Sequence, residues 1–366
     1  MRRKLKIALV HDYLNEFGGA EKVLRVLSEM YPKAPIYTAF CKRNSIAGKA
    51  FADREVRESF LAPILKIWRL YSPLRFLIPV IWRAMDLSEF DVVITSSSAY
   101  IARGFRVTKE TRVICYCHTP PRYLYGYETS VNWKKRWWMR LYMAVLSHYL
   151  RLYDYWSTKR VDVFVANSEN VKRRIAKFYR REAKVIYPPM EIEEMIKRSE
   201  GVRKKGFFLI ISRVVGAKGL IDAARAAKKL KFKLKIGGGS AGFSDLEKRL
   251  SNMGVELLGW VDEPEKVKLM AEARGFIALA CNEDFGMTVV EAQAVGTPVI
   301  AFNGGGFRES VIDGKTGILI DGTDGKSLNQ AMKRFNRVKW NKRELQKNAR
   351  CFTREKFERQ ILEIVG

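Results

Sequence analysis

The chain has 366 residues, of which 47% are hydrophobic and 29% charged, and its formal net charge is +28. This composition is too apolar for a disordered chain, and no segment offers the roughly 18 uninterrupted apolar residues that a membrane-spanning helix needs. A single hydrophobic core stops growing at about 250 to 300 residues, so two domains of similar size are expected.

The positive charge is concentrated in the first half of the chain. Residues 1–190 hold 35 Lys and Arg against 16 Asp and Glu, whereas residues 191–366 hold 32 against 23. Such a field attracts nucleic acid, anionic lipid or small phosphorylated ligands. Charge alone does not choose among these partners.

The cysteines are odd in number and scattered: Cys41, Cys115, Cys117, Cys281 and Cys351. No second pair at metal-binding spacing accompanies Cys115 and Cys117, so no metal site is expected. Reduced thiols in the cytoplasm fit this pattern best.

In the first half, short β-branched runs alternate with amphipathic stretches. Residues 6–13 predict a strand, and not a signal peptide, because their apolar run is only about six residues and ends in His-Asp. A helix over 18–31 follows, then strands at 91–99, 112–120, 161–168 and 183–189. The alternation predicts a parallel sheet covered by helices, which makes residues 1–190 a Rossmann-like N-terminal domain.

Residues 191–205 are charged and rich in turn formers, and we interpret them as a linker. Strands are then predicted at 207–215, 232–239, 255–261, 275–280 and 298–303, with helices between them, so residues 206–340 form a second Rossmann-like domain. Residues 341–366 are expected to form a helix that returns to the first domain. The predicted fold class is α/β, with two doubly wound parallel-sheet domains facing each other across an interdomain cleft.

The most informative loop follows the strand at 275–280. Glu283 lies at the carboxyl end of that strand, and Glu291 lies in the next helix. The start of that helix offers an anion site made of the backbone amides of Phe285, Gly286, Met287 and Thr288. Two carboxylates beside an anion site suit a ligand with both hydroxyls and phosphates, such as a sugar nucleotide.

The strand at 207–215 carries Arg213, and Lys218 lies at the N-terminus of the following helix. Two cations that converge on a helix N-terminus would bind a diphosphate and stabilise a departing nucleoside diphosphate. In a chain this basic, a solvated loop is the alternative.

Two features of the first domain also lie where strands end. The Gly18-Gly19 turn joins the first strand to the first helix and lets a ligand approach the backbone, although such turns are often glycine-rich for packing alone. His118 ends the strand at 112–120, and His11 ends the first strand. A lone histidine is often structural, but a strand-end position favours a role in binding or catalysis.

Several of these motifs occur together, in order: Gly18-Gly19-Ala20-Glu21, His118-Thr119-Pro120-Pro121, Arg213, Lys218-Gly219, Gly259-Trp260-Val261, Phe285-Gly286 and Glu283-x7-Glu291. In this combination the chain resembles the retaining glycosyltransferases of family 4, which have the GT-B fold. The resemblance covers nearly the whole chain.

The resemblance implies a role for each matching residue. Glu283 would hold donor-sugar hydroxyls, Glu291 the ribose diol, and Arg213 with Lys218 the diphosphate. Backbone near Val261 would meet the base, the Gly18-Gly19 turn would border phosphate and acceptor, and His118 would approach the donor sugar. It also implies retention of anomeric configuration and no essential metal or other cofactor. The sequence has no Asp-x-Asp pair, so cations and helix amides would stabilise the leaving group.

The HTPPRYLY stretch and the GGGFRESV loop further resemble mannosyltransferases of surface-polysaccharide and lipopolysaccharide synthesis. We therefore expect transfer of a hexosyl unit, mannosyl from GDP-mannose, to a lipid-linked or polysaccharide acceptor. UDP-sugars stay open as donors. The competing hypothesis is a catalytically silent module that binds a sugar nucleotide or a membrane.

Two other patterns compete with this interpretation. Gly237, Gly239, Gly242 and the later Glu256 superficially satisfy an NAD-binding fingerprint, but the match lies in the middle of the second domain and does not open it. Residues 59–85 and 131–156 combine aromatic and basic side chains. These runs could be core helices with solvated charges, membrane-surface helices or nucleic-acid contacts. Because neither carries a nucleic-acid-binding motif, we expect an anionic membrane surface as partner, and no nucleic acid, with the protein peripheral at the cytoplasmic face.

Overall fold

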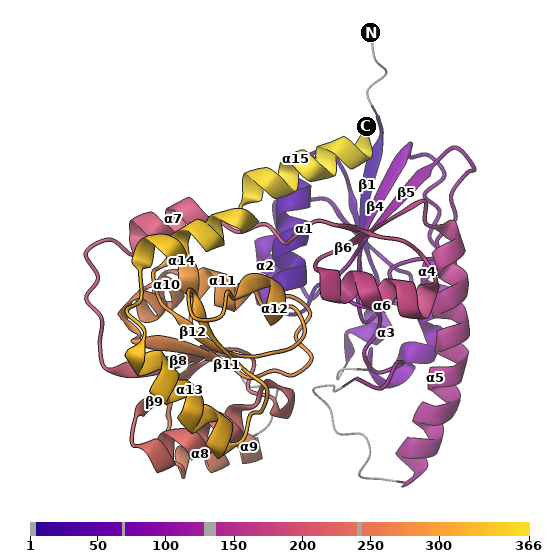
Figure 1. Ribbon diagram of the computed structural model, residues 1–366. Coiled ribbons are helices and arrows are strands. Elements are labelled where there is room, and N and C mark those ends of the chain that lie inside the picture. Colours follow the sequence, from indigo (N-terminus) through magenta and orange to yellow (C-terminus); the bar gives the residue numbers. More distant parts are fainter. Residues whose placement is uncertain (1–4, 68–69, 128–136, 240–243) are drawn as a thin grey trace. The chain divides into compact units, whose positions relative to one another are not determined.

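The computed structural model describes residues 5–67, 70–127, 137–239 and 244–366. The chain divides into two compact units, residues 1–189 with 357–366 and residues 190–356. Each is an α/β unit whose strands are all parallel (Figure 1).

Within the described residues, unit 1 contains a seven-stranded sheet in the order β3-β2-β1-β4-β5-β6-β7. The strands are β1 (Ile7–His11), β2 (Ile36–Thr38), β3 (Val56–Glu58), β4 (Val92–Ser97), β5 (Arg112–Cys117), β6 (Val163–Ala166) and β7 (Lys184–Val185). The helices are α1 (Gly19–Met30), α2 (Ile46–Ala50), α3 (Ala62–Leu65), α4 (Ile78–Arg83), α5 (Trp137–Ser157), α6 (Glu169–Tyr179) and the last part of α15 (Arg354–Val365).

Successive strand residues point to opposite faces of the sheet, and helices cover both faces of the unit 1 sheet. Val93 and Cys115 lie in one apolar cluster with side chains of α4, α5 and α6. Ile94 and Tyr116 lie in the other, with side chains of α1 and α15. This continuous burial explains why the strands read as unbroken apolar runs.

Unit 2 contains a six-stranded sheet in the order β10-β9-β8-β11-β12-β13. The strands are β8 (Phe207–Ile211), β9 (Lys233–Gly237), β10 (Glu256–Gly259), β11 (Gly275–Ala278), β12 (Val299–Phe302) and β13 (Gly317–Ile320). The helices are α7 (Ile192–Arg198), α8 (Leu220–Leu230), α9 (Ser244–Ser251), α10 (Glu263–Glu272), α11 (Met287–Ala294), α12 (Phe307–Ser310), α13 (Gly325–Arg337) and α14 (Lys342–Ala349).

Two segments differ from the predicted domain boundaries. Residues 191–205, interpreted as a linker, contain helix α7 and belong to unit 2, because Ile192 and Met195 are buried on one side of that helix. Of residues 341–366, only 357–366 group with unit 1, where Phe357 and Ile361 enter its core. The segment before them, including α14, belongs to unit 2.

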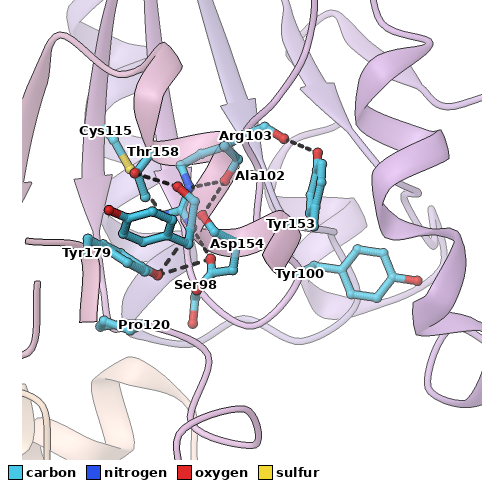
Figure 2. Close-up of polar contacts among 12 residues, drawn as sticks. Ser98, Tyr100, Ala102, Arg103, Cys115, Pro120, Tyr153, Asp154, Thr158 and Tyr179 are labelled. Carbon is cyan, nitrogen blue, oxygen red and sulfur yellow. Dashed lines mark hydrogen bonds and ion pairs between the residues drawn. The ribbon is translucent and has the colours of Figure 1, made fainter. Parts of the chain in front are cut away.

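Helix α5 is fixed to unit 1 by a buried polar cluster (Figure 2). Arg103, in the loop after β4, forms an ion pair with Asp154 of α5, and both side chains are at most 2% exposed. The Tyr179 hydroxyl lies 3.1 Å from one Asp154 oxygen and the Tyr125 hydroxyl 2.7 Å from the other. Since a buried charge is tolerated only when it is paired and hydrogen-bonded, this cluster sets the position of the helix.

Candidate functional site

The site predicted in the second half of the chain lies at the carboxyl end of the unit 2 sheet. Strands β8, β11 and β12 are neighbours and parallel, so the loops that follow them leave the same edge. The first loop carries Arg213, the second Glu283 and the third the glycines Gly304 to Gly306. Ligands of such sheets bind at this edge.

Lys218 and Glu283, which are 65 residues apart in sequence, form an ion pair with 2.5 Å between Nζ and Oε2. Lys218 closes the 3-10 turn before α8, and Gly219 begins that helix with φ +68. A Cβ atom at Gly219 would lie 2.7 Å from Cβ of Leu279, so only glycine lets this turn come so close to the end of β11. The predicted cation and the predicted carboxylate are therefore brought together, each about one-fifth exposed.

The predicted anion site comprises residues 285–288, and Gly286 precedes α11 with φ +89. A Cβ atom there would lie 2.5 Å from the Phe307 ring. The Phe285 side chain is 2% exposed and packs edge-on against Phe352, so a ligand could meet its backbone and not its ring. Met287 and Thr288 are half-buried at the first turn of α11.

The Gly304–Gly306 loop holds the Glu283 backbone in place. The amide of Gly306 donates a hydrogen bond to the Glu283 carbonyl oxygen at 3.0 Å. A Cβ atom at Gly305 would lie 2.3 Å from that same oxygen. In the sequence this loop was only part of the family resemblance, and its contact with the Glu283 backbone was not predicted. The run of three glycines after a strand could have indicated such a close backbone approach.

Glu291 is buried in α11 and forms an ion pair with Lys266 of α10, with 2.9 Å between Oε2 and Nζ. Lys266 is itself 7% exposed and also contacts Glu263 at 2.7 Å. The sequence did not indicate Lys266 as a site residue, because its position on α10 looks like that of any exposed helix lysine. The structure makes it the cation that holds the second carboxylate of the predicted site.

Arg213 is exposed in the loop after β8, and Val261 is half-buried just after β10. Between these two loops lies the glycine run after β9. The Gly238 amide donates to the Gly259 carbonyl at 2.6 Å, and the Ser212 amide donates to the Gly237 carbonyl at 3.0 Å. A dinucleotide-binding turn would offer its glycine amides to a pyrophosphate, so the bond made by the Gly238 amide counts against NAD binding. Gly242 of that fingerprint lies outside the described residues.

The predicted site residues of unit 1 are joined by one hydrogen-bonded chain at the ends of β1, β4 and β5. Nε2 of His118 lies 2.8 Å from the Ser96 hydroxyl, which lies 3.0 Å from Nδ1 of His11. Nε2 of His11 lies 3.4 Å from Glu21, whose other oxygen accepts the Gly18 amide at 2.8 Å. Gly18 and Gly19 are exposed at the start of α1. The chain thus connects the Gly18-Gly19 turn with His118.

His118 is 8% exposed, and burial together with the nearby His11 lowers its pKa to about 3. The imidazole is therefore neutral at physiological pH and acts as one hydrogen-bond donor and one acceptor. Ser96 and Glu21 were not predicted as site residues. For Ser96 the only signal was its place at a strand end, whereas Glu21 belongs to the Gly18-Gly19-Ala20-Glu21 motif and was given no role there.

No cluster of three or more His, Cys, Asp and Glu side chains that could hold a metal ion occurs in the part of the chain that the structure describes. All five cysteines are free. In the same described residues, no helix combines the length and hydropathy needed to span a membrane.

Two family models match the chain, and together they span both units. Residues 17–194 match the model "Glycosyltransferase Family 4", and residues 191–352 match "Glycosyl transferases group 1". A 41.2 kDa protein of the cps region of Klebsiella pneumoniae is 26% identical and covers 80% of this chain and 81% of its own length. The alpha-1,3/1,6-mannosyltransferase ALG2 of Dictyostelium discoideum is 23% identical over 88% of this chain and 87% of its own.

The crystal structure of HepE from Anabaena in complex with UDP and glucose resembles the chain with a TM-score of 0.67. Its sequence identity is 18%, and the match covers 99% of both chains. At that identity the likeness shows the fold alone. The two family models and the two parallel-sheet units agree on one assignment: the chain belongs to the family 4 glycosyltransferases with the GT-B fold.

Proposed function

We propose that this glycosyltransferase transfers a mannosyl unit from GDP-mannose to a lipid-linked or polysaccharide acceptor, with retention of anomeric configuration. The observation that carries the proposal is the ion pair of Lys218 and Glu283 at the ligand-binding edge of unit 2. It combines a cation for a diphosphate with a carboxylate for sugar hydroxyls. The similarity to the mannosyltransferase ALG2 supports mannose as the sugar.

Each charged group at this edge has a proposed part in donor binding. Lys218 and Arg213 bind the diphosphate, the backbone at Phe285 to Thr288 contributes its amides, and Glu283 accepts hydrogen bonds from sugar hydroxyls. Glu291, held by Lys266 at 2.9 Å, accepts the ribose hydroxyls. Backbone near Val261 meets the base. In unit 1, the Gly18-Gly19 turn and His118 serve the phosphate, the acceptor and the donor sugar.

The proposed transfer needs no metal. The bond between the anomeric carbon and the diphosphate oxygen breaks while an acceptor hydroxyl oxygen bonds to the same carbon from the same face. The acceptor proton passes to the departing diphosphate, whose growing charge Lys218 and Arg213 stabilise. Full turnover in excess EDTA and an α-linked product from an α-linked donor are expected. Loss of activity in EDTA would contradict the metal-free mechanism.

Donor choice is tested by thermal unfolding with a panel of ligands. GDP-mannose, GDP, UDP-glucose, UDP-galactose and UDP are each added at the same concentration. A ligand at 100 times its Kd stabilises the folded state by about 2.7 kcal/mol, which raises Tm by a few degrees for a chain of this size. GDP-mannose is expected to raise Tm more than the other ligands do. A larger rise with a UDP-sugar would contradict GDP-mannose and identify that UDP-sugar as the donor. No shift with any nucleotide sugar would reject the donor site.

We also propose that helix α5 places the enzyme on an anionic membrane surface. Its buried side, including Leu146 and Leu150, packs into unit 1. Its exposed side, here the α5 face, is also apolar and consists of Leu141, Val145, Tyr149, Leu152 and Trp156, with exposed fractions of 38 to 66%. Their spacing of three or four residues keeps them on one side of the helix. A contiguous exposed apolar stripe of this kind marks an interaction site.

The charges beside the α5 face select the partner. Arg140 and Arg151 are exposed on the helix, and Arg83 of α4 lies over the Trp156 ring at 4.9 Å. Asp154, the acidic residue of the helix, is fully buried against Arg103. Apolar and cationic side chains without an exposed carboxylate favour anionic lipid. A second copy would bring another +28 charges and be repelled. Residues 68–69 and 131–136 of the predicted basic-aromatic runs lie outside the described residues.

Sedimentation with vesicles tests this surface. Wild type is expected to bind phosphatidylcholine vesicles that contain phosphatidylglycerol and not to bind pure phosphatidylcholine. The double variant Val145→Asp/Leu152→Asp should lose binding, whereas Leu362→Asp, a change at a 55% exposed leucine of α15, should keep it. Equal binding by all three proteins, or a dimer in sedimentation velocity that the double variant abolishes, would contradict the proposal.

A further inference from the structure

The strands and the first helix of unit 1 bring four polar side chains into one hydrogen-bonded line, which runs from Glu21 through His11 and Ser96 to His118. His11 and Ser96 are register partners on β1 and β4, and the His118 amide bonds to the Ser97 carbonyl at 2.9 Å. His11, Ser96 and His118 therefore lie on the same face of the sheet, the face that α1 covers with Glu21. Of these four, Ser96 is completely buried and His11 is 2% exposed.

The Ser96 hydroxyl has one proton and two histidine nitrogens within hydrogen-bond distance. It can donate to one nitrogen and must accept from the other, so the proton on one ring decides where the proton lies on the other. The donor and acceptor of each hydrogen bond in this line are determined at the Glu21 end. A carboxylate at Glu21 can only accept, which makes Nε2 of His11 the donor. An imidazole that carries its one proton on Nε2 then accepts the Ser96 proton at Nδ1.

The same logic continues to His118. With its proton given to His11, the Ser96 oxygen accepts from Nε2 of His118. A neutral His118 that carries its proton on Nε2 has a lone pair on Nδ1. We infer that Ser96, directed by His11 and Glu21, is a positioning residue that holds His118 as the Nε2-protonated tautomer, with Nδ1 presented as a hydrogen-bond acceptor for a ligand hydroxyl. Only the identity of that ligand, the donor sugar, rests on the proposed function.

Glu21 extends the effect to the Gly18-Gly19 turn. Its second oxygen accepts the Gly18 amide at 2.8 Å, so the carboxylate holds the turn and directs the chain at once. The charged and titratable groups around His11 are Glu21 on α1, Asp12 next in sequence and His118 beyond β5. Asp12 is satisfied by the amides of Ser98, Tyr100 and Ala102 and takes no part in the chain.

The first test reads the tautomer directly by ¹⁵N NMR of the whole protein labelled at histidine. The chain contains three histidines, so His148→Gln assigns the signals of the exposed one by difference. At neutral pH, wild-type His118 is expected to show a protonated Nε2 and an unprotonated Nδ1. The opposite pattern, with the proton on Nδ1, would overturn the inference whatever the enzyme's substrate proves to be.

Variants then test the direction of control. In Glu21→Gln the amide can donate to Nε2 of His11, which reverses each bond in the chain and should move the His118 proton to Nδ1. Ser96→Ala should leave a mixture of tautomers. The matched control is Ser97→Ala, which removes a buried hydroxyl that has no hydrogen-bond partner among the described residues. An unchanged His118 spectrum in both Glu21→Gln and Ser96→Ala would overturn the inference.

Turnover provides the second readout. Ser96→Ala should lower kcat about tenfold with little change in KM for the donor, a factor equivalent to about 1.4 kcal/mol and to one hydrogen bond. Ser97→Ala should keep wild-type kcat. If Ser96→Ala changes the tautomer but not kcat, the positioning role is rejected. Failure of every nucleotide sugar to stabilise the protein would instead reject the proposed donor and leave the NMR result standing.

Discussion

Nζ of Lys218 lies 2.5 Å from Oε2 of Glu283, although one residue precedes α8 and the other follows β11. In this pair a cation and a carboxylate neutralise each other's charge at the edge of the sheet where the donor is proposed to bind. Both side chains are about one-fifth exposed, so the pair contributes modestly to folding and is available for exchange with ligand groups.

Glu283→Gln should lower kcat/KM by about 100-fold or more, because a neutral amide binds the sugar hydroxyls less strongly than a carboxylate does. The free energy of unfolding should change little. Steady-state kinetics and urea denaturation check the two parts. Glu256→Gln, which breaks the ion pair between Lys235 of β9 and Glu256 at the start of β10, should leave kcat/KM unchanged. Equal losses in both variants would point to a general charge effect.

Glu291→Gln should be destabilising by about 1 to 3 kcal/mol, because it weakens the main partner of a lysine that is 7% exposed. Lys266 retains Glu263, which limits the loss. Glu263→Gln is the matched control, since it changes the exposed carboxylate on the same lysine and should have a smaller effect. Urea denaturation measures both. A larger loss in Glu263→Gln would show that the buried contact is the weaker one.

Asp154→Asn should be destabilising by about 3 to 5 kcal/mol, because the Arg103 guanidinium would be left buried without its counter-charge. Since the same cluster fixes α5, vesicle binding should also weaken. Asp86→Asn breaks an exposed pair with Arg106, 3.4 Å apart, and should leave Tm close to that of wild type. A small effect of Asp154→Asn would mean that the hydroxyls of Tyr125 and Tyr179 are sufficient to hold the helix.

His118 should make stability fall in acid. Its pKa is about 3 in the folded protein against about 6.5 unfolded, so between these values the unfolded chain binds more protons. The free energy of unfolding therefore rises with pH across this window and is lost as pH falls from 6.5 towards 3. His118→Gln should flatten that slope in denaturation series from pH 4 to 7. His148→Gln, at an exposed histidine of α5, should keep it.

Much of the fold followed from local pattern. The apolar runs at β1, β4, β5, β8 and β11 are long enough, and their helices amphipathic enough, to be recognised without a structure. Strands β2 and β3 were not predicted, because three residues carry too little periodicity. Helix α7 was taken for a linker because its charged residues outnumber its buried ones, Ile192 and Met195.

The candidate site divides in the same way. Glu283, Lys218 and His118 were predicted because parallel strands bring their carboxyl ends to one edge, a rule that acts on sequence position alone. Lys266 and Ser96 were not, because an ordinary helix or strand position does not show which side chain tertiary packing will place opposite it. Glu21 was noted only as part of the Gly18-Gly19-Ala20-Glu21 motif. Val261 and Arg213 lie in the expected loops.

The distribution of charge along the chain shows what each level of structure contributes. The sequence by itself determined that the net positive charge and the aromatic residues are concentrated in the first half, because composition is independent of folding. Only the tertiary structure decided that Asp154 is buried while Leu141, Val145 and Leu152 of the same helix are exposed. The reason is that a helix presents two sides, and burial of one of them depends on the partners that the rest of the chain supplies.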